Sequence, residues 1–232
     1  MREPLLDIVG LLLAPMLVPQ ALCVRSTIEV LPEPPGPRFG RVGEGPELRL
    51  LVLGDSAAAG VGAAHQDEAL LGQLLSRLQG RYTVDYRLLA VSGATTIDLS
   101  EWLLRERPWP ADLVVTSLGV NEVTRGRRLK TWSSRQRTLV ELLRRQFSAR
   151  HIVLSSVPPM GDFVGIPQPL RWYLGQRARL LDQALKELPH CQVVGVDGCL
   201  SPMLAKDGFH PGPDIYRAWA ERILTQTGEL LC

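Results

Sequence analysis

Two short stretches of the chain carry side chains of the kind that nucleophilic catalysis uses. Ser56 ends the stretch Gly54-Asp55-Ser56, where a glycine-bordered turn can expose its hydroxyl and a following helix start offers backbone N–H groups to an anion. Near the end of the chain, Asp207 precedes His210 by three residues. A carboxylate at that spacing can reach a ring nitrogen, fix the tautomer and stabilise the imidazolium.

Two further stretches could stabilise a developing negative charge. Gly93 lies in Ser92-Gly93-Ala94, where the missing side chain lets the backbone N–H approach a ligand closely. Asn121 follows Gly119-Val120, and its side-chain amide could donate to an oxyanion. Each of these four signals also has a structural alternative: a helix cap at Ser56, glycine and asparagine turns at Gly93 and Asn121, and an ordinary turn before His210.

The elements that must position these residues alternate along the chain. Short, mainly apolar segments predict strands at Leu48–Leu53, Tyr82–Leu89, Leu113–Ser117, Ile152–Ser156 and Val193–Val196. Helical spacing predicts helices at Glu68–Leu78, Ile97–Arg105, Trp132–Phe147, Leu170–Leu188 and Pro213–Thr227. This alternation predicts a parallel sheet with helices on both faces. Ligands bind beyond the carboxyl ends of such strands, which is where Ser56, Gly93 and Asn121 fall.

The joint order of these motifs resembles that of the SGNH (GDSL-type) hydrolase superfamily, from roughly Leu48 to Leu224. The resemblance implies an α/β fold, a flavodoxin-like three-layer α/β/α sandwich, here with a five-stranded parallel sheet. It also implies ester hydrolysis without a metal or an organic cofactor. Carried over by residue, Ser56 is the nucleophile and first oxyanion donor, with Gly93 and Asn121 as the other donors. His210 is the general base and Asp207 orients it.

Two positions depart from the family pattern. Glu122 stands where the family usually has Asp after the Asn, and Ala57 replaces the Leu that often follows Gly-Asp-Ser. The groups that the chemistry needs are retained, so the resemblance still implies an active hydrolase. The local geometry of the loop at Glu122 is left open.

The substrate is less clearly indicated. The apolar segment 157–167 should border the site. Its side chains could form the wall of an acyl pocket, or they could pack as ordinary loop residues. The side chains in question are Met160, Phe163, Val164 and Ile166, with Trp172 and Tyr173 behind them. We expect a small-molecule ester or thioester of a short- to medium-chain acyl group. Two alternatives stay open: a carbohydrate O-acetylesterase, and a non-catalytic, membrane-docked binding module.

Residues 1–45 differ in character from residues 46–232, which form the predicted hydrolase domain. Ile8–Val18 is apolar but broken by Pro15, and it is shorter than the roughly 20 residues that span a bilayer. An interfacial or core-docking helix and a secretion signal both remain open, as does peripheral membrane contact. A cytoplasmic or peripherally membrane-associated location is favoured. Residues 31–45, rich in Pro and Gly, predict an extended connector.

Composition excludes several classes of protein. With 232 residues, of which 45% are hydrophobic, the chain fits one domain with an extension and is not disordered. Its net charge of +2 argues against a nucleic-acid partner. The four cysteines (Cys23, Cys191, Cys199 and Cys232) lack metal-ligand spacing and predict free, buried thiols. The oligomeric state is not indicated.

A basic run follows Asn121 closely. It consists of Arg125, Arg127, Arg128, Lys130, Arg135 and Arg137. Such a run could attract a phosphate-bearing substrate or an anionic membrane surface, or it could simply form a solvated face.

Overall fold

The computed structural model describes residues 2–195 and 203–228. Its sheet has six strands in the order β1-β3-β2-β4-β5-β6. Five are parallel: β2 (Glu47–Gly54), β3 (Thr83–Ala90), β4 (Leu113–Ser117), β5 (His151–Ser155) and β6 (Gln192–Val194). Taken by themselves, these five follow the flavodoxin-like strand order, in which the chain switches direction next to its first parallel strand, β2.

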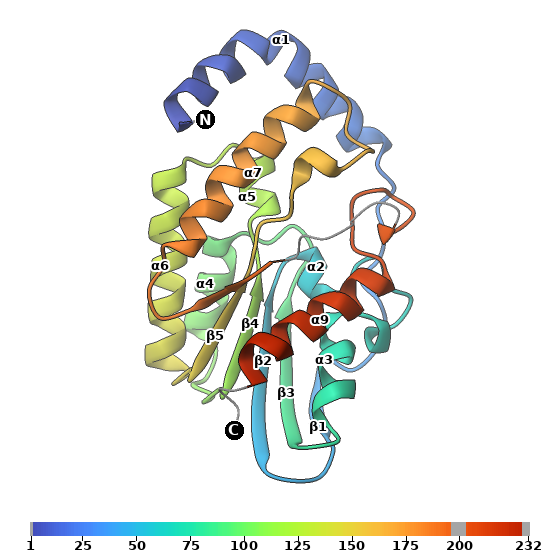
Figure 1. The fold of residues 1–232 in the computed structure, drawn as a ribbon, viewed down its shortest axis with the longest axis vertical. Coiled ribbons are helices and arrows are strands. Elements are labelled where there is room, and N and C mark those ends of the chain that lie inside the picture. Colours follow the sequence, from blue (N-terminus) through green and yellow to red (C-terminus); the bar gives the residue numbers. More distant parts are fainter. Residues whose placement is uncertain (1, 196–202, 229–232) are drawn as a thin grey trace.

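Helices cover both faces of this sheet (Figure 1). On one face lie α3 (Leu70–Leu78) and α9 (Pro213–Thr227), and on the other α4 (Thr96–Arg105), α6 (Leu129–Gln146) and α7 (Leu170–Lys186). The alternation within β2 shows why two cores form. Leu50 and Val52 face the first helix layer, whereas Leu51 and Leu53 face the second. The predicted three-layer α/β/α fold is therefore confirmed.

Short helical turns lie at the ends of the strands and helices. They are α2 (Ser56–Ala59) and α5 (Val120–Thr124), together with the 3-10 helices Gln66–Glu68 and Met160–Asp162. The sequence pattern is too short at these places to predict helices, because one turn shows no periodicity.

The expected number of strands is wrong by one. Phe39–Val42, within the predicted extended connector, forms β1 and pairs antiparallel with β3. Its sequence, Phe-Gly-Arg-Val, has a glycine in its interior and carries little strand signal, so the strand depends on its pairing with β3 at the edge of the sheet. At the opposite edge, β6 covers the first two residues of the predicted strand Val193–Val196, whose last residue lies outside the described residues. The division into residues 1–45 and 46–232 stays a prediction.

The N-terminal segment is one helix, α1 (Glu3–Thr27), which continues through Pro15 and Pro19. The expectation that Pro15 breaks the apolar run is therefore wrong. Both prolines lie on the exposed side, where carbonyls that lose their donors can be solvated. Figure 1 shows α1 arching over the end of α7. Within the described residues, α1 is the helix that is long and apolar enough to cross a membrane.

Two of the four cysteines can be placed. Cys23 and Cys191 both carry free thiols. Cys23 is exposed, so the prediction of a buried thiol is wrong there, whereas Cys191 is half-buried. Burial raises the pKa of the Cys191 thiol to about 11. Cys199 and Cys232 lie outside the described residues.

Candidate functional site

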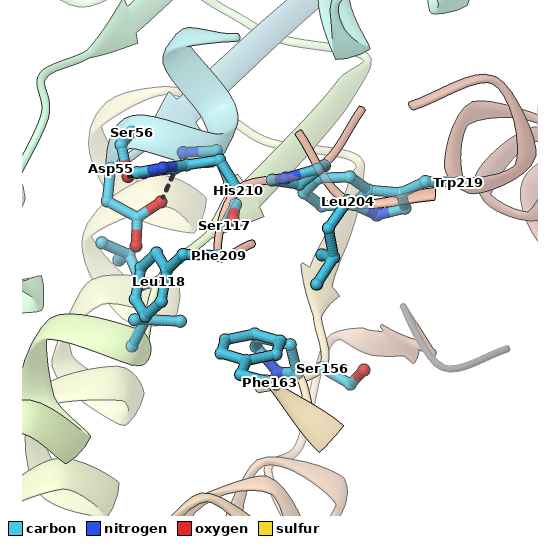
Figure 2. Close-up of a pocket in the computed structure, with 14 residues that line it drawn as sticks. Asp55, Ser56, Ser117, Leu118, Ser156, Phe163, Leu204, Phe209, His210 and Trp219 are labelled. Atoms are coloured by element: carbon cyan, nitrogen blue, oxygen red, sulfur yellow. Dashed lines mark hydrogen bonds between the residues drawn. The ribbon is translucent and has the colours of Figure 1, made fainter. Parts of the chain in front are cut away.

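The turn after β2 places Ser56 at the carboxyl end of the sheet. Gly54 has a φ of 149°, and a Cβ there would come within 2.1 Å of the Ser117 carbonyl oxygen. Glycine is therefore needed for β2 and β4 to lie this close. The Asp55 N–H donates to the same carbonyl at 3.1 Å, and the Asp55 carboxylate caps α2 by accepting the Ala57 N–H (Figure 2). These bonds fix Ser56 at the first position of α2.

His210 connects Ser56 to a buried carboxylate. Its Nε2 lies 3.0 Å from the Ser56 Oγ, and its Nδ1 lies 2.5 Å from the Asp207 Oδ2. An ionised carboxylate can only accept, so Nδ1 carries the proton and Nε2 is left to accept the serine hydroxyl hydrogen. The arrangement can therefore move the Ser56 proton to His210.

The loop that carries Asp207 is built around this carboxylate. Its Oδ1 accepts the backbone N–H groups of Phe209 and His210, both at 3.0 Å, and its side chain is fully buried. Burial alone would raise the pKa of Asp207, but the hydrogen bonds from the His210 ring and from these two N–H groups outweigh it. The pKa is lowered, and Asp207 stays ionised beside His210.

Asp55 has the opposite electrostatics. Asp55 is buried next to Ser56. Among the described residues, no positively charged side chain donates a hydrogen bond to its carboxylate. Burial raises its pKa to about 7, even though the Ala57 N–H lowers it, and the negative charge of Glu122 adds to the rise. This carboxyl therefore titrates near neutral pH.

Gly93 and Asn121 follow the two strands that flank β2. In the sheet register, Gly54 pairs with Ala90 of β3 and with Ser117 of β4, so both residues come after the same level of the sheet as Ser56. The φ of Gly93 is 83°, a left-handed conformation that favours glycine. The Asn121 amide donates one hydrogen to the Ala94 carbonyl at 2.9 Å. An amide carries two hydrogens, so a second remains for a ligand.

Glu122, which departs from the family pattern, has a structural role. Its side chain is buried, and Oε1 accepts the backbone N–H and the hydroxyl of Thr96 at 2.7 and 2.6 Å. Gln136 donates to the same hydroxyl from α6. Glu122 thus joins the turn that carries Asn121 to the start of α4, next to the Gly93 loop.

Two contacts around Gly93 are not apparent from the sequence. Arg125 donates to the Gly93 carbonyl at 2.9 Å, which gives this member of the basic run a positioning contact. Glu33 accepts both the N–H and the hydroxyl of Ser92. Glu33 belongs to the Pro-rich segment after α1, where no motif marks it.

A small cavity of about 50 Å³ opens beside Ser56 and His210 (Figure 2). Its walls are mainly apolar and include Leu118, Phe163, Leu204, Phe209 and Trp219. The Phe209 ring packs edge-on against both Phe163 and His210, with centroid distances of 5.2 Å. The cavity can therefore take a small apolar group next to the serine hydroxyl.

The expected acyl wall is largely wrong. Phe163 lines the cavity, but Met160 and Ile166 are buried in the core, and Val164 is exposed. Tyr173 packs against Gly10 of α1. The prediction assumed that apolar residues near the site face it, whereas most of this loop serves to anchor α7.

The described residues were also considered as possible metal ligands. In residues 2–195 and 203–228, no group of three or more His, Cys, Asp or Glu side chains could hold a metal ion.

The model of the GDSL-like lipase/acylhydrolase family matches residues 52–218. No curated protein sequence matches the chain.

Solved structures share the fold. One is an acetylxylan esterase from Geobacillus stearothermophilus, with 20% identity and a TM-score of 0.57 over 79% of this chain and 95% of that one. Another is a member of the lipolytic protein G-D-S-L family from Veillonella parvula, with 13% identity and a TM-score of 0.59 over 77% and 97% of the two chains.

Proposed function

The chain belongs to the GDSL-like lipase/acylhydrolase family, and from that premise we propose that it hydrolyses short- to medium-chain acyl esters or thioesters through an acyl-enzyme on Ser56. The family makes it an ester-hydrolysing enzyme that acts on small-molecule esters, and lends no support to a non-catalytic module. The observation that supports the proposal most strongly is the chain of hydrogen bonds from the Ser56 hydroxyl through the His210 ring to the buried Asp207 carboxylate.

Acylation begins at the serine hydroxyl. The Ser56 Oγ attacks the carbonyl carbon while His210 Nε2 takes its proton, and Asp207 stabilises the imidazolium that forms. His210 then gives the proton to the leaving alcohol or thiol, and the bond from that group to the acyl carbon breaks. Water repeats the sequence on the acyl-enzyme, releases the carboxylic acid and restores Ser56.

Three donors are proposed to hold the oxyanion of each tetrahedral intermediate: the N–H groups of Ser56 and Gly93, and the Asn121 amide. Support comes from the sheet register, which brings all three to one level, and from the second amide hydrogen of Asn121. Such donors stabilise charge that develops only in the transition state, so they raise kcat rather than substrate affinity.

The acyl group is proposed to occupy the cavity between His210, Phe163 and Trp219. Its space of about 50 Å³ favours the short end of the range. Longer chains would have to displace Phe209 or Phe163, whose rings pack against each other. Apolar walls favour an alkyl group over a charged one.

The test is hydrolysis of p-nitrophenyl acetate, butyrate and octanoate by the wild type, Ser56→Ala and Ser134→Ala. Ser134 is an exposed serine of α6 and serves as the matched control. We expect activity that falls from acetate or butyrate to octanoate and disappears in Ser56→Ala alone. Equal activity in Ser56→Ala would overturn the acyl-enzyme, and an equal rate on all three esters would overturn the pocket.

A second candidate is removal of acetyl groups from carbohydrates, which the small size of the cavity favours. The acetylxylan esterase that shares the fold is named for such a substrate. We would compare kcat/KM on an acetylated xylo-oligosaccharide with kcat/KM on p-nitrophenyl acetate. A value higher on the sugar by about tenfold or more would favour the deacetylase, because sugar contacts would then contribute to transition-state binding.

A further inference from the structure

The helix α1 has two unlike faces. Its inner face packs on α7, with Leu6 fully buried and Leu17 nearly so. Its outer face presents a group of large apolar side chains that are 53–77% exposed: Leu5, Ile8, Leu11, Leu12, Met16, Val18 and Leu22. No charged residue lies between Ile8 and Val24. A continuous apolar surface of this kind marks a contact with a protein or a membrane.

Polar contacts hold the inner face against the domain along its length. Asp7 pairs with Arg177 at 3.1 Å, and only 4% of the Arg177 side chain is exposed. Near the other end, Gln20 donates to the Gln168 carbonyl and accepts the Leu170 N–H. A bilayer-spanning orientation would break these contacts, leave Arg177 buried without its carboxylate, and bring Asp7 close to hydrocarbon. The contacts favour a helix that lies flat on the domain.

Basic residues border the outer face at both ends. Arg2 and Arg25 flank the apolar stretch on α1 itself, and both are exposed. Glu3 accepts the N–H of Leu129, which brings the exposed side chains of Arg128 and Lys130 to the N-terminal end of α1. The acidic residues of that end, Glu3 and Asp7, are already engaged by the domain. The charge available to an external partner is therefore positive.

We propose that α1 docks the enzyme on an anionic lipid surface, with the helix in the plane of the headgroups. The outer leucines would enter the acyl region, while the bordering Arg and Lys side chains contact lipid phosphates and carboxylates. This occupant is preferred over a second copy of the chain because aliphatic side chains ringed by like charges complement a negative surface and repel an identical one. The inference is independent of the proposed ester chemistry.

The test is co-sedimentation of the full chain with vesicles of phosphatidylcholine, with and without about 30% phosphatidylserine. The variants are Leu11→Gln/Leu12→Gln on the outer face, Arg128→Glu/Lys130→Glu at its border, and Leu104→Gln/Phe39→Gln as the control. Leu104 and Phe39 are 64% and 77% exposed but lie outside α1. Circular dichroism and esterase activity establish that each variant is folded.

We expect the wild type and the control to bind the anionic vesicles, and salt to weaken that binding. The outer-face variant should bind about tenfold more weakly or worse, since it lacks two of the leucines that would enter the acyl region of the lipid. The charge variant should lose the preference for phosphatidylserine. Binding by the outer-face variant equal to wild type would overturn the proposal. Two results for the wild type would also overturn it. One is dimerisation through α1 without binding to vesicles, and the other is resistance to alkaline extraction, which is typical of a bilayer-spanning helix.

Discussion

Glu33 accepts two hydrogen bonds from Ser92, one from its backbone N–H and one from its hydroxyl, both at 2.8 Å. The segment that follows α1 therefore holds the residue next to Gly93. Burial would raise the pKa of Glu33, but the bonds from Ser92 and the ion pair with Arg38 lower it. The carboxylate thus stays ionised and keeps both bonds at any pH above its lowered pKa.

Glu33→Ala should reduce kcat and leave KM nearly unchanged, because Ser92 would lose both hydrogen bonds to Glu33 and the Gly93 N–H would lose its orientation toward the transition state. We expect a decrease of about tenfold, less than for removal of an oxyanion donor itself. Steady-state kinetics on p-nitrophenyl acetate measure it, with Glu44→Ala as the control in an exposed position of the same segment. A change in KM alone, or none at all, would show that Glu33 does not position the loop.

Asn121→Ala should lower kcat by roughly 100- to 1000-fold, since the amide donates to charge present only in the transition state. Gln226→Ala removes an exposed amide from α9 and should have no effect. The comparison is of kcat at saturating ester. An undiminished kcat in the folded variant would remove Asn121 from the oxyanion site.

Asp207→Asn should lower kcat by about 10³- to 10⁴-fold while the serine remains in place. An Asn oxygen can still accept N–H groups, but the neutral amide no longer stabilises the imidazolium or fixes its tautomer. The control is Asp214→Asn, an exposed carboxylate that pairs with Arg217. Pre-steady-state release of p-nitrophenol measures the acylation rate directly. Acylation at the wild-type rate would contradict the role given to Asp207.

Asp55 predicts a dependence of stability on pH. Folding raises its pKa from 3.8 to about 7, so the folded state binds more protons than the unfolded state between these values. Its contribution to stability is full below the unfolded pKa and is lost as pH rises through the folded pKa. Asp55→Asn is neutral throughout and should be the more stable protein at pH 8, by roughly 2–4 kcal/mol.

Urea unfolding at pH 5 and pH 8 measures this effect, with the exposed Asp67→Asn as the control. The wild type should lose stability between the two pH values, and Asp55→Asn should lose less. Identical pH dependence in the two proteins would show that Asp55 is ionised in both states.

The sequence predicts the centre of this molecule better than its edges. Strand β4 has the predicted bounds because all five residues are buried, and its sequence shows this as the apolar run Leu113–Val115 followed by the small polar residues Thr116 and Ser117. The turns that carry Ser56 and His210 have glycine and carboxylate signals within a few residues. Such local signals survive in one sequence because backbone geometry and side-chain chemistry act there over a short range.

Contacts made over long distances in the chain could not be predicted. The partner of Glu33 is 59 residues away, and that of Asp7 is 170 residues away. Strand β1 depends on pairing with β3, and Pro15 is tolerated because its side of α1 is exposed. The residues around the cavity beside Ser56 come from several distant elements, so proximity to the site along the chain misidentified most of them.

The most direct test of the central claim is covalent labelling with a fluorophosphonate ester, followed by peptide mass spectrometry. A serine activated by His210 attacks the phosphorus and expels fluoride, which leaves a stable phosphonyl ester on the oxygen. We expect one adduct per chain, on the peptide that contains Ser56, with esterase activity falling in proportion to labelling. No adduct on Ser56 in the folded protein, or full activity after labelling, would contradict the assignment of Ser56 as the nucleophile.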